Sequence, residues 1–278
     1  MTLISVVIPA LNDAAMLRRA LASLASQTRP ADEIIVVDNG STDDTAEVAR
    51  LGGARVVVEL RRGIPAATAA GFDAAVGSII ARVDADSVPP ADWLARVDLR
   101  FAADPGLAAL TGPGEFYGAG RVVRVLGDAL YIGGYFWSMG WLLGHPPLFG
   151  SNLALRRSSW ARIRETSHRD VRELHDDLDL AFQFRPGMRV AFDRSLRMPI
   201  SARPFGSLRG LGRRLHWAYT TVAVNAREQS LRRRRAEYRA WARGRAYPPL
   251  VAHPFASARF ESRSSQSDSI SPELHQHT

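Results

Sequence analysis

The stretch ISVVIPALNDAAMLRRALASLAS, residues 4–26, decides the fold class, because it joins a short β-branched run to a longer stretch of helical periodicity. The run ISVVI at residues 4–8 is typical of a buried strand. The residues that follow space their apolar side chains three or four apart: Ala14, Leu17, Leu21 and Leu24. A buried strand followed directly by an amphipathic helix is the opening of an alternating α/β chain.

The same order continues through the first hundred residues. Three further β-branched runs bounded by Pro, Asp or Gly predict strands at residues 33–37 (EIIVV), 55–58 (RVVV) and 78–83 (SIIARV). Helices are expected at residues 13–26, 42–51, 66–76 and 91–102. The alternation predicts an α/β fold with a parallel sheet and right-handed connections, which binds ligands at the carboxyl ends of its strands.

Composition excludes several classes of protein. With 278 residues, 46% of them hydrophobic and 23% charged, the chain is long and apolar enough for one large α/β domain or two small ones. The absence of Cys excludes a disulfide scaffold, a thiolate nucleophile and a Cys-based metal site. No Gly-x-Gly-x-x-Gly follows the first strand, which disfavours a dinucleotide-dependent oxidoreductase.

The basic charge is concentrated in one segment. The formal net charge is +8, whereas Arg203–Arg245 alone holds twelve Arg and two Glu, so the rest of the chain sums to −2. Such a segment can meet nucleic acid, anionic lipid or an acidic substrate. Nucleic acid is disfavoured because no zinc finger or RNA-binding signature accompanies the charge.

We expect residues 204–246 to form a basic amphipathic helical extension. Its apolar stripe would pack on the core: Leu208, Leu211, Leu215, Tyr219 and Val222. In the simplest hypothesis the opposite face is merely solvated. In a second hypothesis the Arg face, with Trp217 and Trp241, rests on an anionic membrane surface.

The sequence also gives expectations about location, membrane insertion and disorder. Strand-like residues begin at Leu3, so we expect no secretory signal and a cytoplasmic location, with peripheral binding to the inner face of the membrane under the second hypothesis above. The apolar stretch Val125–Gly144 contains Asp128 and five Gly, which favours a buried or interfacial segment over a spanning helix. Residues 247–278 are rich in Ser, His, Gln and Arg and are expected to be disordered.

Three acidic motifs carry the chemistry. Asp38 ends the second strand and could accept hydrogen bonds from a base or ribose, or could simply form an Asx-turn. Asp84 and Asp86 end the fourth strand and could hold Mg²⁺ or Mn²⁺ together with a nucleotide diphosphate, or could cap the next helix. The motif HDDLDL at residues 175–180 could supply a general base, or could cap a helix.

The order of these motifs resembles glycosyltransferase family 2. The resemblance runs from Ile4 to Arg203 through ISVVIPALND, DEIIVVDNGSTDDT, RRGIPAATAAG, IIARVDADSVPPADWL, FGSNLALRRSSW and HDDLDLAFQFRPGMRVAF. It implies a GT-A fold with a Rossmann-like, mostly parallel central sheet flanked by helices. It also implies a nucleotide-diphospho-sugar donor, a divalent metal (Mg²⁺ or Mn²⁺) and inversion at the anomeric carbon. Residues 1–203 would form the catalytic domain, with a nucleotide-binding half to about residue 105 and an acceptor-side half at 106–203.

The resemblance also implies roles for individual residues. Those around the base, ribose and nucleotide are Pro9, Leu11, Asp38, Gly63 and Ala67, with Asp84 facing the donor's ribose or sugar and Asp86 facing the metal. The family's Glu-Asp-x-Asp-Leu pattern falls on Asp176, Asp177, Asp179 and Leu180, which makes Asp177 the candidate base and Asp176 its catalytic neighbour. The sugar and acceptor side would be lined by Gly150, Ser151, Asn152 and Asp179.

The sequence departs from the family at three points. Thr68-Ala69 stands where many members carry Arg-Asn, and no Gln-x-x-Arg-Trp follows the base, which disfavours a processive enzyme. No His follows Pro199, so His175, His216 or water would complete a metal shell. We therefore predict a non-processive glycosyltransferase acting on the hydroxyl of a glycan, lipid or small molecule. The alternatives are transfer to a polyprenyl phosphate or a nucleotide-binding scaffold without catalysis, and the sugar, the nucleotide, the acceptor and the oligomeric state stay open.

Overall fold

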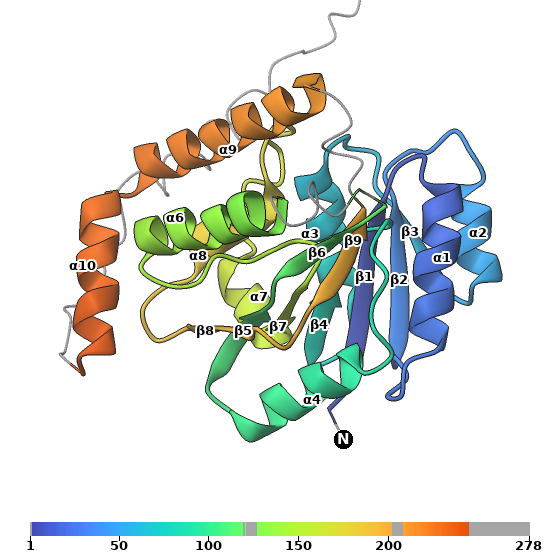
Figure 1. Cartoon of the computed structure of the whole chain (residues 1–278), viewed down its shortest axis with the longest axis horizontal. Helices are drawn as coiled ribbons and strands as arrows, with labels where there is room; N and C mark the ends of the chain where they lie inside the picture. The colour runs from blue at the N-terminus through green and yellow to red at the C-terminus, as the bar shows by residue number, and fades with distance from the viewer. Residues whose placement is uncertain (1, 119, 121–126, 202–207, 245–278) are drawn as a thin grey trace, which may run out of the picture.

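A seven-stranded, mostly parallel sheet forms the centre of the protein, whose computed structural model describes residues 2–118, 120, 127–201 and 208–244 (Figure 1). The strand order is β3-β2-β1-β4-β7-β5-β8. The strands are β1 (Ile4–Ala10), β2 (Glu33–Asp38), β3 (Arg55–Val58), β4 (Ile79–Arg82), β5 (Leu107–Thr111), β7 (Leu153–Arg156) and β8 (Arg189–Phe192). Strand β7 alone among these seven runs antiparallel to its neighbours, β4 and β5.

The alternation expected in the first hundred residues is confirmed. Its helices are α1 (Ala14–Ala25), α2 (Thr45–Leu51), α3 (Ile64–Ala74) and α4 (Trp93–Ala103). Helix α2 begins three residues later than expected, because the Asp43 carboxylate accepts hydrogen bonds from Ala14 N and Thr45 N and holds a turn there. Helix α3 begins two residues earlier, with Pro65 in the first turn, where a backbone N–H has no partner within the helix.

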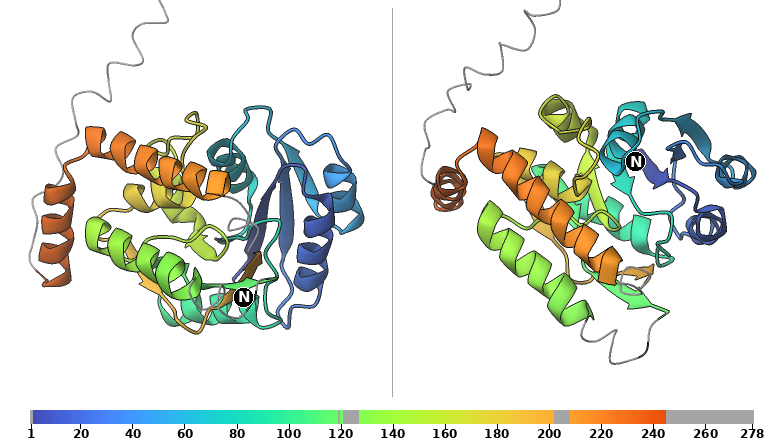
Figure 2. Two further views of the ribbon diagram at one scale, coloured as in Figure 1. Left: turned by 45° about the horizontal axis from the view of Figure 1, so that its top comes forward. Right: turned by 90° about the horizontal axis from the view of Figure 1, so that it is seen from above.

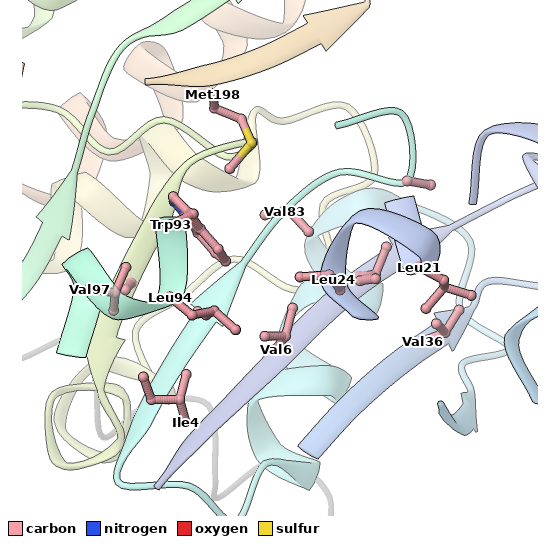
Figure 3. Close-up of a cluster of buried hydrophobic side chains, with 14 of the residues drawn as sticks. Ile4, Val6, Leu21, Leu24, Val36, Val83, Trp93, Leu94, Val97 and Met198 are labelled. Carbon is pink, nitrogen blue, oxygen red and sulfur yellow. The ribbon is translucent and has the colours of Figure 1, made fainter. Parts of the chain in front are cut away.

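Two apolar layers enclose the sheet, one on each face. Residues Ile4, Val6 and Ile8 of β1 pack in one cluster with α1, α2 and α4, whereas Val7 packs in the other with α3. This is the period-two alternation of a strand that is buried on both faces. Figure 3 shows the first cluster, with the side chains of α1 and α4 lying over the strands, and Figure 2 shows helices on both sides of the sheet.

A second, two-stranded sheet follows the central one, although the sequence analysis predicted no strand there. Strands β6 (Gly114–Tyr117) and β9 (Met198–Ser201) pair in parallel. The glycines there serve close packing: a Cβ on Gly112 would stand 2.0 Å from the Leu196 carbonyl oxygen, and one on Gly114 would stand 2.8 Å from Ile200 and from Phe149.

The described part of the apolar stretch 125–144 folds into two consecutive helices of different kinds. From Gly127 it forms a π-helix, η1 (Gly127–Ile132), which continues into α6 (Gly133–Leu143), while residues 125 and 126 lie outside the described part. Helix α6 ends at Gly144, whose φ of +84° suits glycine. In the part of the chain that the structure describes, no helix is both long and apolar enough to cross a membrane.

The C-terminal extension consists of α9 (Leu208–Glu228) and α10 (Leu231–Ala242), and the expected apolar stripe of α9 is wrong in detail. Leu215 and Tyr219 are 61% and 73% exposed, while Thr221 and Asn225 are fully buried. Val222 packs on the core as expected, and α9 also contacts α8 (Asp176–Gln183) and the residue before it through hydrogen bonds that involve Thr221 and Asn225. The side chains of residues 208 and 211, and the whole of 202–207 and 245–278, lie outside the described residues.

Arg234 anchors α10 to the rest of the molecule. Its buried guanidinium donates to the carbonyl oxygens of Phe182, Ala181 and Phe184, at the C-terminal end of α8, over distances of 2.6, 3.0 and 2.9 Å. A cation at a helix C-terminus satisfies free carbonyls and the helix dipole. The two C-terminal helices therefore pack against the helix that begins with the third acidic motif.

Candidate functional site

The candidate site lies at the carboxyl edge of the parallel strands. Because β7 is antiparallel, the loop that leads into it arrives at this edge, and Leu153 pairs with Arg82, the last residue of β4. Gly150 and Ser151 therefore lie beside Asp84, nearly seventy positions earlier in the chain. The order of the strands thus brings Asp84 and Asp86 together with the loop that holds Gly150 and Ser151.

The Asp-x-Asp motif is held from three sides. One oxygen of Asp84 accepts a hydrogen bond from the Ser151 hydroxyl, and the other lies 2.8 Å from Nη2 of Arg82. The Asp86 carbonyl oxygen accepts a 2.7 Å hydrogen bond from the Tyr117 hydroxyl, which ties β6 to the motif. Both carboxylates are half-buried, so both retain access to solvent.

Asp177 lies at the start of α8 with its carboxylate fixed by two backbone donors. One oxygen accepts a 2.7 Å hydrogen bond from Gly150 N, and the other accepts a 2.7 Å bond from Leu178 N. A Cβ on Gly150 would collide with Nη1 of Arg82 and stand 3.2 Å from Asp177, so a side chain there would displace the guanidinium. The half-buried carboxylate is oriented without being enclosed.

Asp176 is buried beneath this surface. Its carboxylate accepts a 2.5 Å hydrogen bond from the Thr68 hydroxyl and lies 3.2 Å from Nη2 of Arg82. Burial raises the pKa of Asp176, the Arg82 guanidinium lowers it, and the neighbouring Asp177 raises it further, with a net upward shift. Thr68, a departure from the family pattern, therefore has a place in the site.

Arg82 forms ion pairs with Asp84 and Asp176, and the sequence analysis missed it. Its side chain is 1% exposed, and burial lowers its pKa, but Asp176, Asp84, Asp177 and Asp86 together raise the pKa further than burial lowers it. The signal was visible in the sequence: one Arg within the apolar run SIIARV, on a strand predicted to be central. A cation buried on such a strand requires anionic partners.

The first acidic motif forms the turn that was the alternative interpretation of Asp38. The Asp38 carboxylate is largely buried and accepts a 2.8 Å hydrogen bond from Ser41 N, as in an Asx-turn. The strand register places Ala10 opposite Asp38, so Pro9, which is buried, and Leu11, which is exposed, lie at the same edge.

Asn39, which the sequence analysis did not single out, fixes the neighbouring loop. Its amide nitrogen donates to the carbonyl oxygens of Glu59 and Arg61, and its oxygen accepts a 2.8 Å hydrogen bond from Gly63 N. Gly63 has a φ of +135°, which disfavours any residue with a side chain. Gly63 thus lies beside the residue that follows Asp38, and its backbone N–H is used inside the protein.

Three residues predicted to line the site are structural. Ala67 is buried in the cluster under α3, where its side chain packs on the core. Asn152 is fully buried. Its side-chain oxygen accepts a hydrogen bond from Trp93 Nε1, and its side-chain nitrogen donates to the carbonyl oxygens of Pro113 and Leu196. Asp179 is buried and accepts hydrogen bonds from His168 and Asn225, so it joins α8 to α9 instead of facing the acceptor.

The donor set of the site suits a hard cation only in part. Within the described ranges, no group of three or more His, Asp or Glu side chains could hold a metal. His175 is turned toward α9, where its Nε2 lies 2.9 Å from the Arg214 carbonyl oxygen, and His216 is exposed near Glu173. The half-buried Asp86, with Asp84 beside it, offers carboxylate oxygens, so further ligands would come from a bound diphosphate and water.

His168 makes the stability of the α8–α9 contact pH-dependent. Its hydrogen bond with Asp179 and the nearby Glu228 raise its pKa to about 9, although burial opposes them. Because this pKa is above the usual value, the stabilisation is complete below about pH 6.5 and is lost as pH rises through about 9. We expect the Tm difference between the wild type and His168→Gln to be largest at pH 6 and to shrink by pH 9.5. Calorimetry beside the exposed control His216→Gln measures it, and a constant difference would contradict the prediction.

Comparison with solved structures identifies the fold. Glucosyl-3-phosphoglycerate synthase from Mycobacterium tuberculosis, solved in complex with Mn²⁺, UDP and glucosyl-3-phosphoglycerate, superposes with a TM-score of 0.55 at 23% identity, over 81% of this chain and 80% of that one. The structure is therefore the α/β GT-A fold that the sequence led us to expect. Residues 5–172 match the family described as Glycosyl transferase family 2. The chain belongs to glycosyltransferase family 2.

Curated relatives match part of the chain. An uncharacterized glycosyltransferase of Mycobacterium tuberculosis is 41% identical over 109 residues, which cover 39% of this chain and 47% of that protein. Glycosyltransferase AglE of Haloferax volcanii is 33% identical over 127 residues, which cover 43% of this chain and 39% of that protein. The match thus spans less than half the length of these relatives.

Proposed function

We propose that the protein is a non-processive, inverting glycosyltransferase that moves one sugar from a nucleotide-diphospho-sugar to an acceptor hydroxyl. One observation carries the proposal: the Asp177 carboxylate is held by Gly150 N at the carboxyl edge of the sheet, beside Asp84. Family membership supports the class of reaction. A fixed, partly exposed carboxylate at this edge is suited to take a proton from a hydroxyl.

Each acidic residue has a role in this proposal. Asp38, with Pro9 and Leu11, would lie at the base and ribose, and Asp84 at the ribose or sugar of the donor. Asp177 would accept the hydroxyl proton as the acceptor oxygen attacks, while Gly150 N and Leu178 N keep its carboxylate in place. Asp86 would hold a divalent cation, which stabilises charge on the leaving diphosphate. Arg82, from below, would keep four carboxylates at close range compatible with one another.

The nucleotide and metal can be tested before the acceptor is known. The similar synthase binds UDP with Mn²⁺, which makes UDP-sugars the first donors to try. Because the described residues form no complete metal site, we expect Mn²⁺ alone to bind weakly and Mn²⁺ with a nucleotide-sugar to bind tightly. In Asp86→Ala the Mn²⁺-dependent part of donor affinity should fall at least about tenfold.

Titration calorimetry with UDP-, GDP- and dTDP-sugars, with and without Mn²⁺, measures this effect. Asp92→Ala is the matched control, since Asp92 follows the motif closely but is exposed and paired with Arg96. Tight binding that ignores both Mn²⁺ and Asp86→Ala, with no turnover, would favour the scaffold alternative. The same titrations would name the donor class.

The extension suggests a location. The helices α9 and α10 carry exposed Arg side chains, which would favour peripheral binding to an anionic membrane surface. Vesicle co-sedimentation that is independent of anionic lipid and of salt would contradict this part of the proposal.

A further inference from the structure

An open hollow of about 540 Å³ lies between β6, η1, α6 and the segment that joins β8 to β9. Its apolar walls come from η1, α6 and the end of β8: Ile132, Phe136, Trp137 and Phe192. The charged rim consists of Glu115 and Arg197, which form an ion pair, and of Arg194, for which the described residues provide no ion pair. The chemistry of the hollow is therefore an apolar surface with an excess of positive charge at its edge.

Aromatic contacts connect this hollow to the candidate base. The Phe136 ring centroid lies 4.5 Å from that of Phe192 and 6.2 Å from that of Phe149. Phe149 directly precedes Gly150, whose N–H donates to Asp177. A molecule lying in the hollow would thus contact Phe136, which packs on the residue directly before the Gly150 that orients the Asp177 carboxylate.

Helix α6 presents an uncharged, aromatic surface beside the hollow. Trp137 and Trp141 are 76% and 59% exposed and are four residues apart, so they lie on one side of the helix, and α6 contains no charged residue. A helix that is apolar all round is normally buried, and an exposed one marks a surface for an apolar partner.

Basic side chains flank this surface. Helix α10 packs on α6, with the guanidinium of Arg235 3.7 Å from the Trp141 ring centroid, and α10 exposes Arg232, Arg233 and Arg239. Figure 2 shows α6 and α9 side by side, with α10 across one end of both. Exposed Trp beside clustered Arg matches the interface of an anionic lipid bilayer, where aromatic rings lie at headgroup depth.

We propose that the acceptor is a membrane lipid: Trp137 and Trp141 enter the bilayer interface, the Arg side chains of α10 meet anionic headgroups, and the hollow takes the apolar chain of the acceptor. This inference rests on the proposed function, since it names the acceptor class of the same site. It gives the uncharged α6 a partner and places the polar head of the lipid on the side of the hollow nearest Asp177.

Binding of two probes to the full chain tests the proposal. Farnesyl phosphate, measured by calorimetry, reports on the hollow, and vesicles of phosphatidylcholine with phosphatidylglycerol, measured by co-sedimentation, report on the α6 surface. We expect Trp137→Ser to weaken both by about tenfold or more. Trp141→Ser, outside the hollow, should weaken vesicle binding only, and the exposed control Leu60→Ser neither.

The outcomes separate this inference from the function on which it rests. Nucleotide-sugar binding with Mn²⁺ is measured on the same samples, and it should be unchanged in all three variants. Equal affinity for inorganic phosphate and farnesyl phosphate would mean that the hollow binds only the anion, which would overturn the lipid assignment. Unchanged binding of farnesyl phosphate and of vesicles by Trp137→Ser would overturn it as well. Absence of donor binding with lipid binding intact would overturn the proposed function and leave the lipid surface standing.

Discussion

Asp177→Asn should lower kcat by about 10³-fold while leaving donor affinity within about twofold of the wild type. The Asn side chain has nearly the same shape and keeps one acceptor oxygen for Gly150 N or Leu178 N, so the loop stays in place. What it loses is the capacity to take a proton from the acceptor hydroxyl. Turnover is measured as nucleotide diphosphate release with the acceptor, and donor affinity by calorimetry.

Two comparisons make this result specific. Glu173→Gln removes an exposed carboxylate from the loop just before α8 and should leave kcat unchanged. A kcat for Asp177→Asn within about tenfold of the wild type would contradict a base at this position. It would favour the polyprenyl phosphate alternative, because a phosphate acceptor oxygen is already ionised and needs no base.

The sequence predicted the first hundred residues well, because each helix and strand there is defined by its own residues. Each strand from β1 to β4 is a short apolar run with its own boundaries, and each helix between them carries its own periodicity, so each element could be predicted from its own residues. The first two acidic motifs, at Asp38 and at Asp84 and Asp86, were predicted at the carboxyl edge because each lies at the end of one of these strands. Predicting these strands and helices required no knowledge of which distant residues they contact.

The second half could not be predicted in the same way. The antiparallel insertion of β7 between β4 and β5 depends on pairings across more than forty residues, and these pairings decide that Gly150 meets Asp177. Burial could not be predicted from the motifs either. Asn152 and Asp179 match the family pattern, but the polar atoms of both side chains form hydrogen bonds with partners inside the protein. A motif gives the type of residue, and only the fold gives its exposure.

Arg82→Met should destabilise the protein by about 3–5 kcal/mol and lower turnover at least about 100-fold. Methionine fills much of the space but leaves the buried Asp176 carboxylate without its cation, and Arg82 is what lowers the pKa of Asp176 against burial. Asp84 loses the same partner, which frees it from its place beside Ser151. Chemical unfolding measures the free energy of unfolding. The control is Arg96→Met, which removes an exposed ion pair with Asp92 and should change that free energy by no more than about 0.5 kcal/mol.

The double variant Arg82→Met/Asp176→Asn separates charge balance from catalysis. Removing the buried carboxylate together with its cation leaves no uncompensated charge at that position, so a large part of the lost stability should return. Turnover should stay low, because Asp84 and Gly150 are still without the guanidinium that packs against both. A double variant as unstable as Arg82→Met would mean that Arg82 acts through packing alone. Recovery of turnover along with stability would mean that Arg82 serves the fold and has no part in positioning the site.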